Sequence, residues 1–331
     1  MKSVTMKNQL HVRCGQALIA ILFALGLSLL GLSNSAIAEE DIPYLLTVSA
    51  KGDLATVRAM LDSGTNPNVR DMDGASALMY AARKDKAEVA QALLEKGADP
   101  NAKDNSGWTA LMLAARKNYL KTAEVLLNHG ADPALRDVSG WSAMGMAATS
   151  GYSDMVAMLI EHGMDANTKS DDGKSILMYA AKNGDVATIK VLLAHGALLA
   201  DHDRLKLTAL IYAAREGNLA AVETLIAAGA KVDDGDQYQW TALSWAVRKK
   251  HVQVVSALIA KGADVNHKDG EGTPPLHNAV LNGDVPMVDL LIKSGANVKA
   301  KDQYGLSALV YALKGKSPEI VKMIKDAGGN Y

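Results

Sequence analysis

The segment Asp104–Arg136, DNSGWTALMLAARKNYLKTAEVLLNHGADPALR, shows the local structure from which most of the chain is built. A polar turn leads to Thr109, whose hydroxyl can accept a hydrogen bond from a free amide at the start of a helix. Apolar residues at helical spacing then predict a first helix over 110–117 and a second near 120–128. Gly130 follows as a left-handed C-terminal cap. The segment therefore predicts a turn and two short helices.

This segment recurs along the 331-residue chain with a period of 33 residues. The capping glycine recurs at Gly64, Gly97, Gly130, Gly163, Gly196, Gly229, Gly262, Gly295 and Gly328. Residues that tolerate a left-handed backbone share one column between the two helices: Gly52, Asp85, Asn118, Gly151, Gly184, Gly217 and Gly283. Nine units fill residues 39–331, and the first and last deviate as solubilising terminal units do. We therefore expect an all-α repeat solenoid with no second domain.

The unit resembles the ankyrin repeat. The best match is the eighth unit, with GTPPLH at 272–277 and LLIKSGA at 290–296, whereas other units replace the family's TPLH by Ser/Thr-Ala-Leu-Met. The resemblance implies a stack of helix-turn-helix units with short β-hairpin turns, and a concave groove in which partners bind. Between Gly196 and Gln239 the pattern deviates, because Lys206 and Gln239 replace the turn glycine. We expect altered hairpins there, or a local change of curvature.

Composition excludes several classes of protein. A hydrophobic content of 49% excludes a disordered chain, and 35 basic against 36 acidic residues do not suit a nucleic-acid binder. One cysteine excludes a disulfide framework and a cysteine-rich zinc module. Beyond residue 38 we find no cysteine nucleophile, no glycine-rich phosphate loop and no HExxH motif. We expect a protein with no enzymatic activity, no cofactor and no nucleic-acid partner.

Residues 1–38 have the pattern of a cleaved secretory signal peptide. Three basic residues precede an apolar run over 17–32, and a small-residue triplet ends at Ala38, just before acidic residues. Cleavage there leaves 32 basic and 36 acidic residues, a net charge of −4, and no stable membrane insertion. The chain resembles exported ankyrin-like proteins of the bacterial periplasm. Secretion, or tethering to a membrane by an uncleaved signal, are the alternatives for its location.

Two sets of side chains are candidates for partner binding in the groove. The aromatic set lies in the turns and comprises Trp108, Trp141, Trp240, Tyr238 and Tyr304. The basic set follows the first helices and comprises Arg83, Lys84, Arg116, Lys117, Lys182, Arg215, Arg248 and Lys249. Such a basic groove predicts a protein partner with an acidic patch, and an acidic outer surface on this chain. The alternatives are aromatic packing between hairpins and basic residues that suit the helix dipole.

Histidine and aspartate also recur, but we do not expect a metal. His129, His162 and His195 each precede a capping glycine, where an imidazole can bond to the last helix carbonyls. The segment Asp201–Asp203, together with Asp233, Asp234 and Asp236, is the only plausible ligand cluster, and it has no recognised ligand spacing.

These observations predict a non-enzymatic protein-binding scaffold of the bacterial periplasm. The resemblance to periplasmic ankyrin-like proteins further implies a role in supporting a catalase or a stress response. The alternatives are an inhibitor or immunity partner of an exported toxin or lipase, and a host-directed ankyrin effector.

Overall fold

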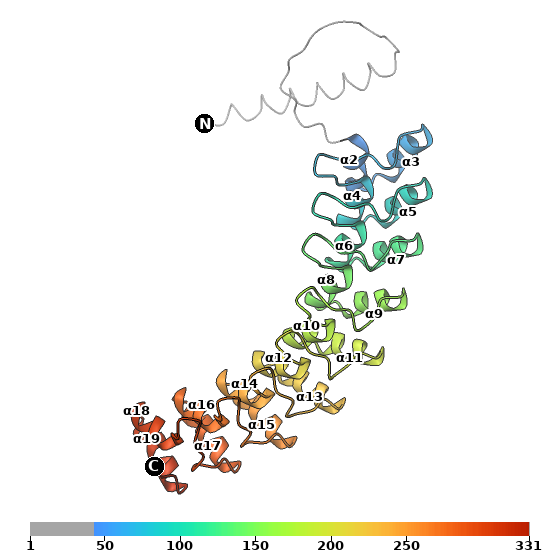
Figure 1. Cartoon of the computed structure of the whole chain (residues 1–331). Helices are drawn as coiled ribbons and strands as arrows, with labels where there is room; N and C mark the ends of the chain where they lie inside the picture. Colours follow the sequence, from blue (N-terminus) through green and yellow to red (C-terminus); the bar gives the residue numbers. More distant parts are fainter. Residues whose placement is uncertain (1–42, 331) are drawn as a thin grey trace, which may run out of the picture. The chain divides into compact units, whose positions relative to one another are not determined.

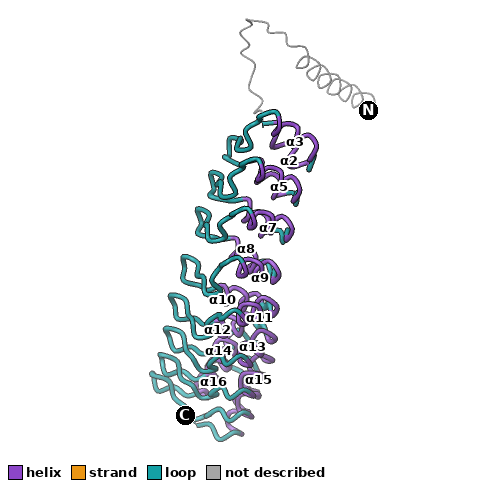
Figure 2. The backbone as a smooth tube through the Cα atoms, turned by 90° about the vertical axis from the view of Figure 1, so that its right-hand side faces the viewer, coloured by secondary structure: helices purple, strands orange, loops and turns teal. Residues whose placement is uncertain are grey.

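A computed structural model describes residues 43–330 of the protein; the expected signal peptide, residues 1–38, lies outside the described residues. Residues 43–330 belong to one compact unit, a row of helix pairs that bends gradually along its length (Figure 1). Turns follow one edge of the row and helices the other (Figure 2).

Each pair consists of a first and a second helix. The first helices are α2 (Tyr44–Lys51), α4 (Ala77–Arg83), α6 (Ala110–Ala115), α8 (Ala143–Thr149), α10 (Ile176–Asn183), α12 (Ala209–Glu216), α14 (Ala242–Arg248), α16 (Pro275–Leu281) and α18 (Ala308–Lys314). The second helices are α3 (Leu54–Asp62), α5 (Ala87–Glu95), α7 (Leu120–Asn128), α9 (Ser153–Glu161), α11 (Val186–Ala194), α13 (Leu219–Ala227), α15 (Val252–Ala260), α17 (Val285–Lys293) and α19 (Pro318–Asp326). First helices contact the first helices of neighbouring units, and second helices do the same, so the row has two layers.

The local signals at the helix ends act as the sequence predicts. The Thr109 hydroxyl accepts a hydrogen bond from the Met112 amide at 3.3 Å, and α6 begins at the next residue. This helix ends at Ala115, two residues earlier than expected, because the chain already turns toward Asn118, which has a φ of +57°. The second helix, α7, has the predicted bounds, and Gly130 after it has a φ of +84°.

Within residues 43–330 the turns between units form no regular β-strands. Five of these turns carry one isolated antiparallel bridge each, for example Arg136 to Ser142. Gly107 needs to be glycine for two reasons: its φ is +79°, and a Cβ there would lie 2.9 Å from the Val138 amide nitrogen of the next turn.

The expectation of altered hairpins between Gly196 and Gln239 is wrong. Lys206 and Gln239 adopt φ values of +61° and +62°, the left-handed conformation that glycine has in other units. Their turns still close, since the backbone amide of Asp203 donates to the Leu207 carbonyl at 3.1 Å and that of Asp236 to the Trp240 carbonyl at 3.0 Å. A left-handed non-glycine residue costs about 1–2 kcal/mol, and these closed turns tolerate that strain.

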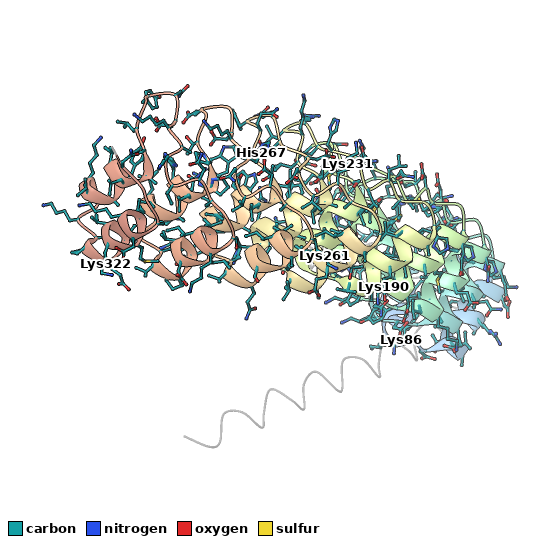
Figure 3. All side chains as sticks on the ribbon, turned by 90° about the horizontal axis from the view of Figure 1, so that it is seen from below. Lys86, Lys190, Lys231, Lys261, His267 and Lys322 are labelled. Carbon is teal, nitrogen blue, oxygen red and sulfur yellow. The ribbon has the colours of Figure 1, made fainter. Side chains whose placement is uncertain are left out.

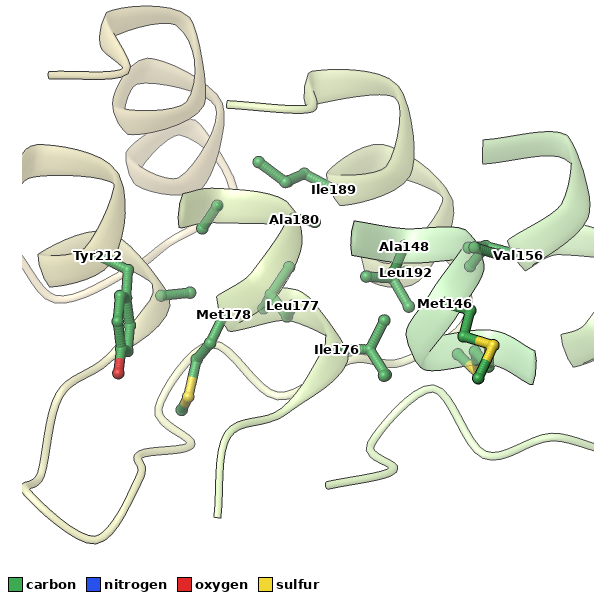
Figure 4. Packing of buried hydrophobic residues seen from close by; sticks show 14 of the residues in the cluster. Met146, Ala148, Val156, Ile176, Leu177, Met178, Ala180, Ile189, Leu192 and Tyr212 are labelled. Atoms are coloured by element: carbon green, nitrogen blue, oxygen red, sulfur yellow. The ribbon is translucent and has the colours of Figure 1, made fainter. Parts of the chain in front are cut away.

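The core is made of aliphatic side chains between the two helical layers. In its middle, Leu177 and Ala180 of α10 lie beside Ile189 and Leu192 of α11, all fully buried or nearly so (Figure 4). Alanine pairs in the first helices, such as Ala180-Ala181, are completely buried and let adjacent helices approach closely. At the C-terminal end Ile324 is buried while Lys325 is exposed, which suits a terminal unit.

Polar side chains join consecutive units along the turn edge. Asn101 donates to the Gly130 carbonyl at 3.0 Å and accepts from the Asp132 amide at 2.7 Å. A basic residue before the turn makes a second tie, because Lys103 donates to the Arg136 carbonyl at 2.8 Å. Arg70, Arg136 and Lys268 in the same column also donate to the carbonyl 33 residues later, so this column before the turns is structural. None of the helices in residues 43–330 combines the length and the apolar character needed to cross a bilayer.

Candidate functional site

The turn edge is stiffened by a hydrogen bond between an aspartate and an aromatic residue nine positions later. Tyr80 donates to Asp71 at 2.8 Å and Tyr212 to Asp203 at 2.7 Å, while the indole nitrogen of Trp245 donates to Asp236 at 3.0 Å. Tyr212 directs its hydroxyl away from the core toward the turns (Figure 4). In the sequence an aspartate recurs with the 33-residue period at 71, 104, 137, 203, 236, 269 and 302, but its aromatic partners were not predicted, although both columns have the same period.

These bonds change how the partners titrate. Burial, followed by the bond to Asp203, raises the pKa of Tyr212. In the last unit the bond to Asp302 raises the pKa of Tyr311 to about 12. Burial opposes ionisation of Asp302, but its bonds from Tyr311 and from backbone amides lower its pKa overall. Asp302 is thus held ionised as an acceptor that orients the Tyr311 ring.

A cleft of about 570 Å³, here called the C-terminal cleft, lies beside the rings of Trp240 and Trp245. Its lining includes Leu205, Arg215, Tyr238, Trp240, Trp245 and Arg248. They come from two first helices, α12 and α14, and from the turns that precede α12 and α14. Four residues of the predicted set meet here: Tyr238, Trp240, Arg215 and Arg248.

Arginine side chains stack on the rings of this cleft. The guanidinium carbon of Arg248 lies 4.9 Å from the ring centroid of Trp240 and 5.7 Å from that of Trp245. That of Arg215 lies 4.7 Å from the Tyr212 centroid and 5.5 Å from the Trp245 centroid. The Trp240 and Trp245 centroids are 5.3 Å apart. Stacking fixes the arginines, so less conformational entropy is lost when a partner binds them.

A second hollow of about 440 Å³, the N-terminal cleft, lies four units earlier. Its lining residues are Arg83, Asp104, Ser106, Trp108, Leu113, Arg116 and Lys117. Only Arg116 stacks on Trp108, with the guanidinium carbon 5.2 Å from the ring centroid, while Arg83 lies over Tyr80 at 5.5 Å. Of the predicted set, Trp108, Arg83, Arg116 and Lys117 meet here.

The remaining predicted residues lie outside both clefts. Trp141 packs against Tyr179 with centroids 5.3 Å apart, and its neighbour in the arginine column is Thr149. The space beside it is only about 10 Å³, so for Trp141 the packing alternative fits the structure better. Tyr304 is 69% exposed and projects from the turn edge. Lys84, Lys182 and Lys249 are exposed.

The basic groove is not a continuous stripe, and the outer surface is not uniformly acidic. Thr149 and Leu281 interrupt the arginine column. Exposed lysines also occur on the second helices and at their ends, among them Lys190, Lys261 and Lys322 (Figure 3). The expected acidic outer surface is therefore wrong, because charge is distributed over both sides of the row.

The histidine column has the predicted capping role. His129, His162 and His195 bond through Nδ1 to the carbonyl four residues earlier, at 2.8, 2.9 and 2.8 Å. Residues 43–330 contain no group of three or more side chains placed to hold a metal ion. In particular, the carboxylates of Asp203 and Asp236 each accept a hydrogen bond from a backbone amide of their own turn.

A family model for ankyrin repeats matches residues 45–137, 129–203, 197–269 and 261–331. The chain belongs to the ankyrin-repeat family. This confirms the predicted all-helical repeat solenoid, whose described part has eighteen helices. Ankyrin-repeat proteins are generally non-enzymatic scaffolds that bind other proteins. None of the curated proteins compared with this ankyrin chain matches it.

Proposed function

We propose that this protein is a non-enzymatic scaffold that holds another protein along its turn edge, and that the C-terminal cleft is the principal anchor. The observation that carries the proposal is the stacked set of Arg215, Arg248, Trp240 and Trp245, with Tyr238 above it. Tryptophan, tyrosine and arginine dominate binding energies at interfaces because they bury large areas in fixed geometry.

The N-terminal cleft contributes a weaker, mainly electrostatic contact in this proposal. Its lining has more basic than acidic side chains, with Arg83, Arg116 and Lys117 against Asp104. Exposed charges of this kind steer association more than they add affinity. An acidic patch on the partner would face these residues while a more apolar part enters the C-terminal cleft.

We further propose that the scaffold acts in the bacterial periplasm, so its partner is also exported. The sequence pattern of residues 1–38 supports this location. Cell fractionation tests it: we expect a protein shortened at Ala38 in the periplasmic fraction. Recovery of the full-length chain in the cytoplasm, or of the protein in the culture medium, would contradict it.

The binding function is tested by capture from an envelope extract. The purified protein is compared with the variant Tyr238→Ser/Trp245→Leu, which carries the residues of the N-terminal cleft, Ser106 and Leu113, at the matching positions. We expect a partner identified by mass spectrometry with the natural protein and its loss with the variant. The matched control, Trp108→Leu, should retain it. Equal recovery with the variant would rule out the cleft as the anchor.

A further inference from the structure

The C-terminal cleft contains one arginine that the rest of the protein leaves available. Arg215 forms an ion pair with Glu216 at 3.1 Å. Arg248 makes no ion pair within residues 43–330 and is exposed at the mouth of the cleft. Its guanidinium carbon lies over the Trp240 and Trp245 rings, and its N–H groups donate no hydrogen bond within residues 43–330. They are therefore available to a carboxylate, which can accept two parallel hydrogen bonds from one guanidinium.

The surroundings of Arg248 select against other charges. Guanidinium groups already lie over Trp240 and Trp245, so a cationic ligand cannot use these rings without displacing an arginine. Asp236, Asp269 and Glu271 also line the cleft; the Asp236 carboxylate already accepts from the Trp245 indole, and all three would repel a highly acidic segment. The cleft therefore accommodates one carboxylate rather than a cluster of them.

An apolar rim adjoins this position. Leu205 is 49% and Tyr238 is 64% exposed, and their turns are joined by a bond of 3.0 Å from the Gln237 amide to the Leu205 carbonyl. Both residues line the cleft. Burial of these exposed side chains by an apolar group would be favourable. A volume of about 570 Å³ is within the range of small-ligand sites, which suits one short segment rather than a folded surface.

We propose, on the basis of the scaffold function above, that the partner inserts an extended peptide segment in which a single Asp or Glu adjoins a large apolar side chain. Its carboxylate binds the edge of Arg248, and its apolar side chain packs between Tyr238 and Leu205. Specificity comes from requiring both groups at once.

The test uses blocked tetrapeptides titrated into the purified protein by isothermal calorimetry. The probe is Gly-Glu-Phe-Gly, and the comparison peptides are Gly-Gln-Phe-Gly, Gly-Glu-Gly-Gly and Gly-Lys-Phe-Gly. We expect saturable one-to-one binding of the probe. The three comparison peptides should each bind about fivefold or more weakly, since each loses the charge-assisted bond or the apolar contact.

Matched variants locate the binding. Arg248→Thr, which introduces the residue that Thr149 supplies in the same column, should lower affinity for the probe about fivefold or more. Arg116→Thr in the N-terminal cleft should leave it unchanged. No binding of the probe, equal binding of the Glu and Gln peptides, or unaltered binding by Arg248→Thr would each overturn the proposal.

Two further outcomes separate this proposal from the scaffold function. If a captured partner is lost with Tyr238→Ser/Trp245→Leu but the peptides bind indiscriminately, the scaffold function stands and the proposed peptide chemistry fails. If analytical ultracentrifugation shows self-association that Trp245→Leu abolishes, and no peptide binds, a second copy of this chain occupies the cleft and the proposal is overturned.

Discussion

The N-terminal and the C-terminal clefts are formed by the same columns of the repeat, four units apart. Both contain a tryptophan, two arginines and a turn aspartate: Trp108, Arg83, Arg116 and Asp104 in one, Trp240, Arg215, Arg248 and Asp236 in the other. The differences that concern the rings are Tyr238 and Trp245 in place of Ser106 and Leu113, and on the rim Leu205 stands where the N-terminal cleft has Asp73. In the C-terminal cleft the guanidiniums of Arg215 and Arg248 both lie over the Trp245 ring. In the N-terminal cleft the two arginines lie over separate rings.

The comparison shows that function in this repeat array depends on side chains placed on an unchanging backbone. The turn that carries Ser106 closes with a bond of 3.0 Å between Asp104 and Trp108, and the turn that carries Tyr238 closes with the same length between Asp236 and Trp240. A few substitutions thus separate a basic hollow from an aromatic cleft, without a change of fold.

The largest expected effect comes from converting the C-terminal cleft into its counterpart. Tyr238→Ser/Trp245→Leu should weaken binding of the captured partner about 30-fold or more, because truncating one hot-spot residue costs about 2 kcal/mol or more and the costs of neighbouring residues do not simply add. Calorimetry with the purified partner measures the loss. Trp108→Leu is the control and should cost less than about threefold, since that ring stacks on a single arginine. Equal losses in the two clefts would remove the distinction between them.

The reverse conversion should create a second site. Asp73→Leu/Ser106→Tyr/Leu113→Trp supplies the missing rim and rings beside Arg83 and Arg116, so the N-terminal cleft should gain affinity for Gly-Glu-Phe-Gly by about tenfold. The stoichiometry of peptide binding would then rise from one to two. A stoichiometry that stays at one would show that more than these three residues defines the C-terminal cleft.

The two turn aspartates should differ in their effect on stability. Asp236 accepts hydrogen bonds from the Tyr238 and Trp240 amides and from the Trp245 indole, whereas Asp104 accepts from the Ser106 and Trp108 amides. Asp236→Ala should therefore lower the free energy of unfolding by about 1–2 kcal/mol more than Asp104→Ala, because an indole N–H is left unpaired. Urea denaturation of the two variants measures both free energies of unfolding.

A double-mutant cycle provides the control for that difference. In a Trp245→Leu background the two aspartate substitutions should cost the same, since Asp236 then lacks its indole donor. A difference that persists in this background would locate its cause in the backbone of the turn.

The smallest effect is a difference in pH sensitivity. His277 is fully buried in α16, in the unit that supplies Asp269 to the C-terminal cleft, and burial lowers its pKa. A histidine whose folded pKa is lowered contributes stability that is present above the unfolded pKa of about 6.5 and is lost as pH falls toward the folded value. Amide exchange around α16 should therefore increase between pH 7.5 and 5.5, after correction for intrinsic rates.

The N-terminal cleft serves as the internal reference for this measurement. The position of His277 is occupied there by Met112, which does not titrate. His277→Met should abolish the additional exchange at pH 5.5. An equal acid response around α6 and α16 would mean that other groups determine the pH dependence.

The sequence was sufficient for the fold because each structural signal recurs in register. The 33-residue period, the capping Thr109 and the left-handed Asn118 specified helix pairs with nearly correct bounds. The hairpin expectation failed because Lys206 and Gln239 adopt the left-handed conformation within turns closed by other bonds.

The site could be predicted only in part, because columns in a sequence do not show which side chains meet in space. The aromatic column contained Trp240, which lines a cleft, and Trp141, which packs against Tyr179. Trp245 was missed, since its position in a helix suggested no role, and yet it contacts both arginines of the C-terminal cleft. Trp141 and Trp240 share one column, so the column alone does not separate the packed ring from the ring that lines a cleft.

Site-specific photo-cross-linking tests the central claim most directly. A photoreactive phenylalanine analogue is placed at position 238 or at position 106, the same column in the two clefts, and the protein is irradiated with its captured partner. We predict a strong cross-link from position 238 and a weak one from position 106. A strong cross-link from position 106 with none from position 238 would contradict the assignment of the C-terminal cleft as the anchor.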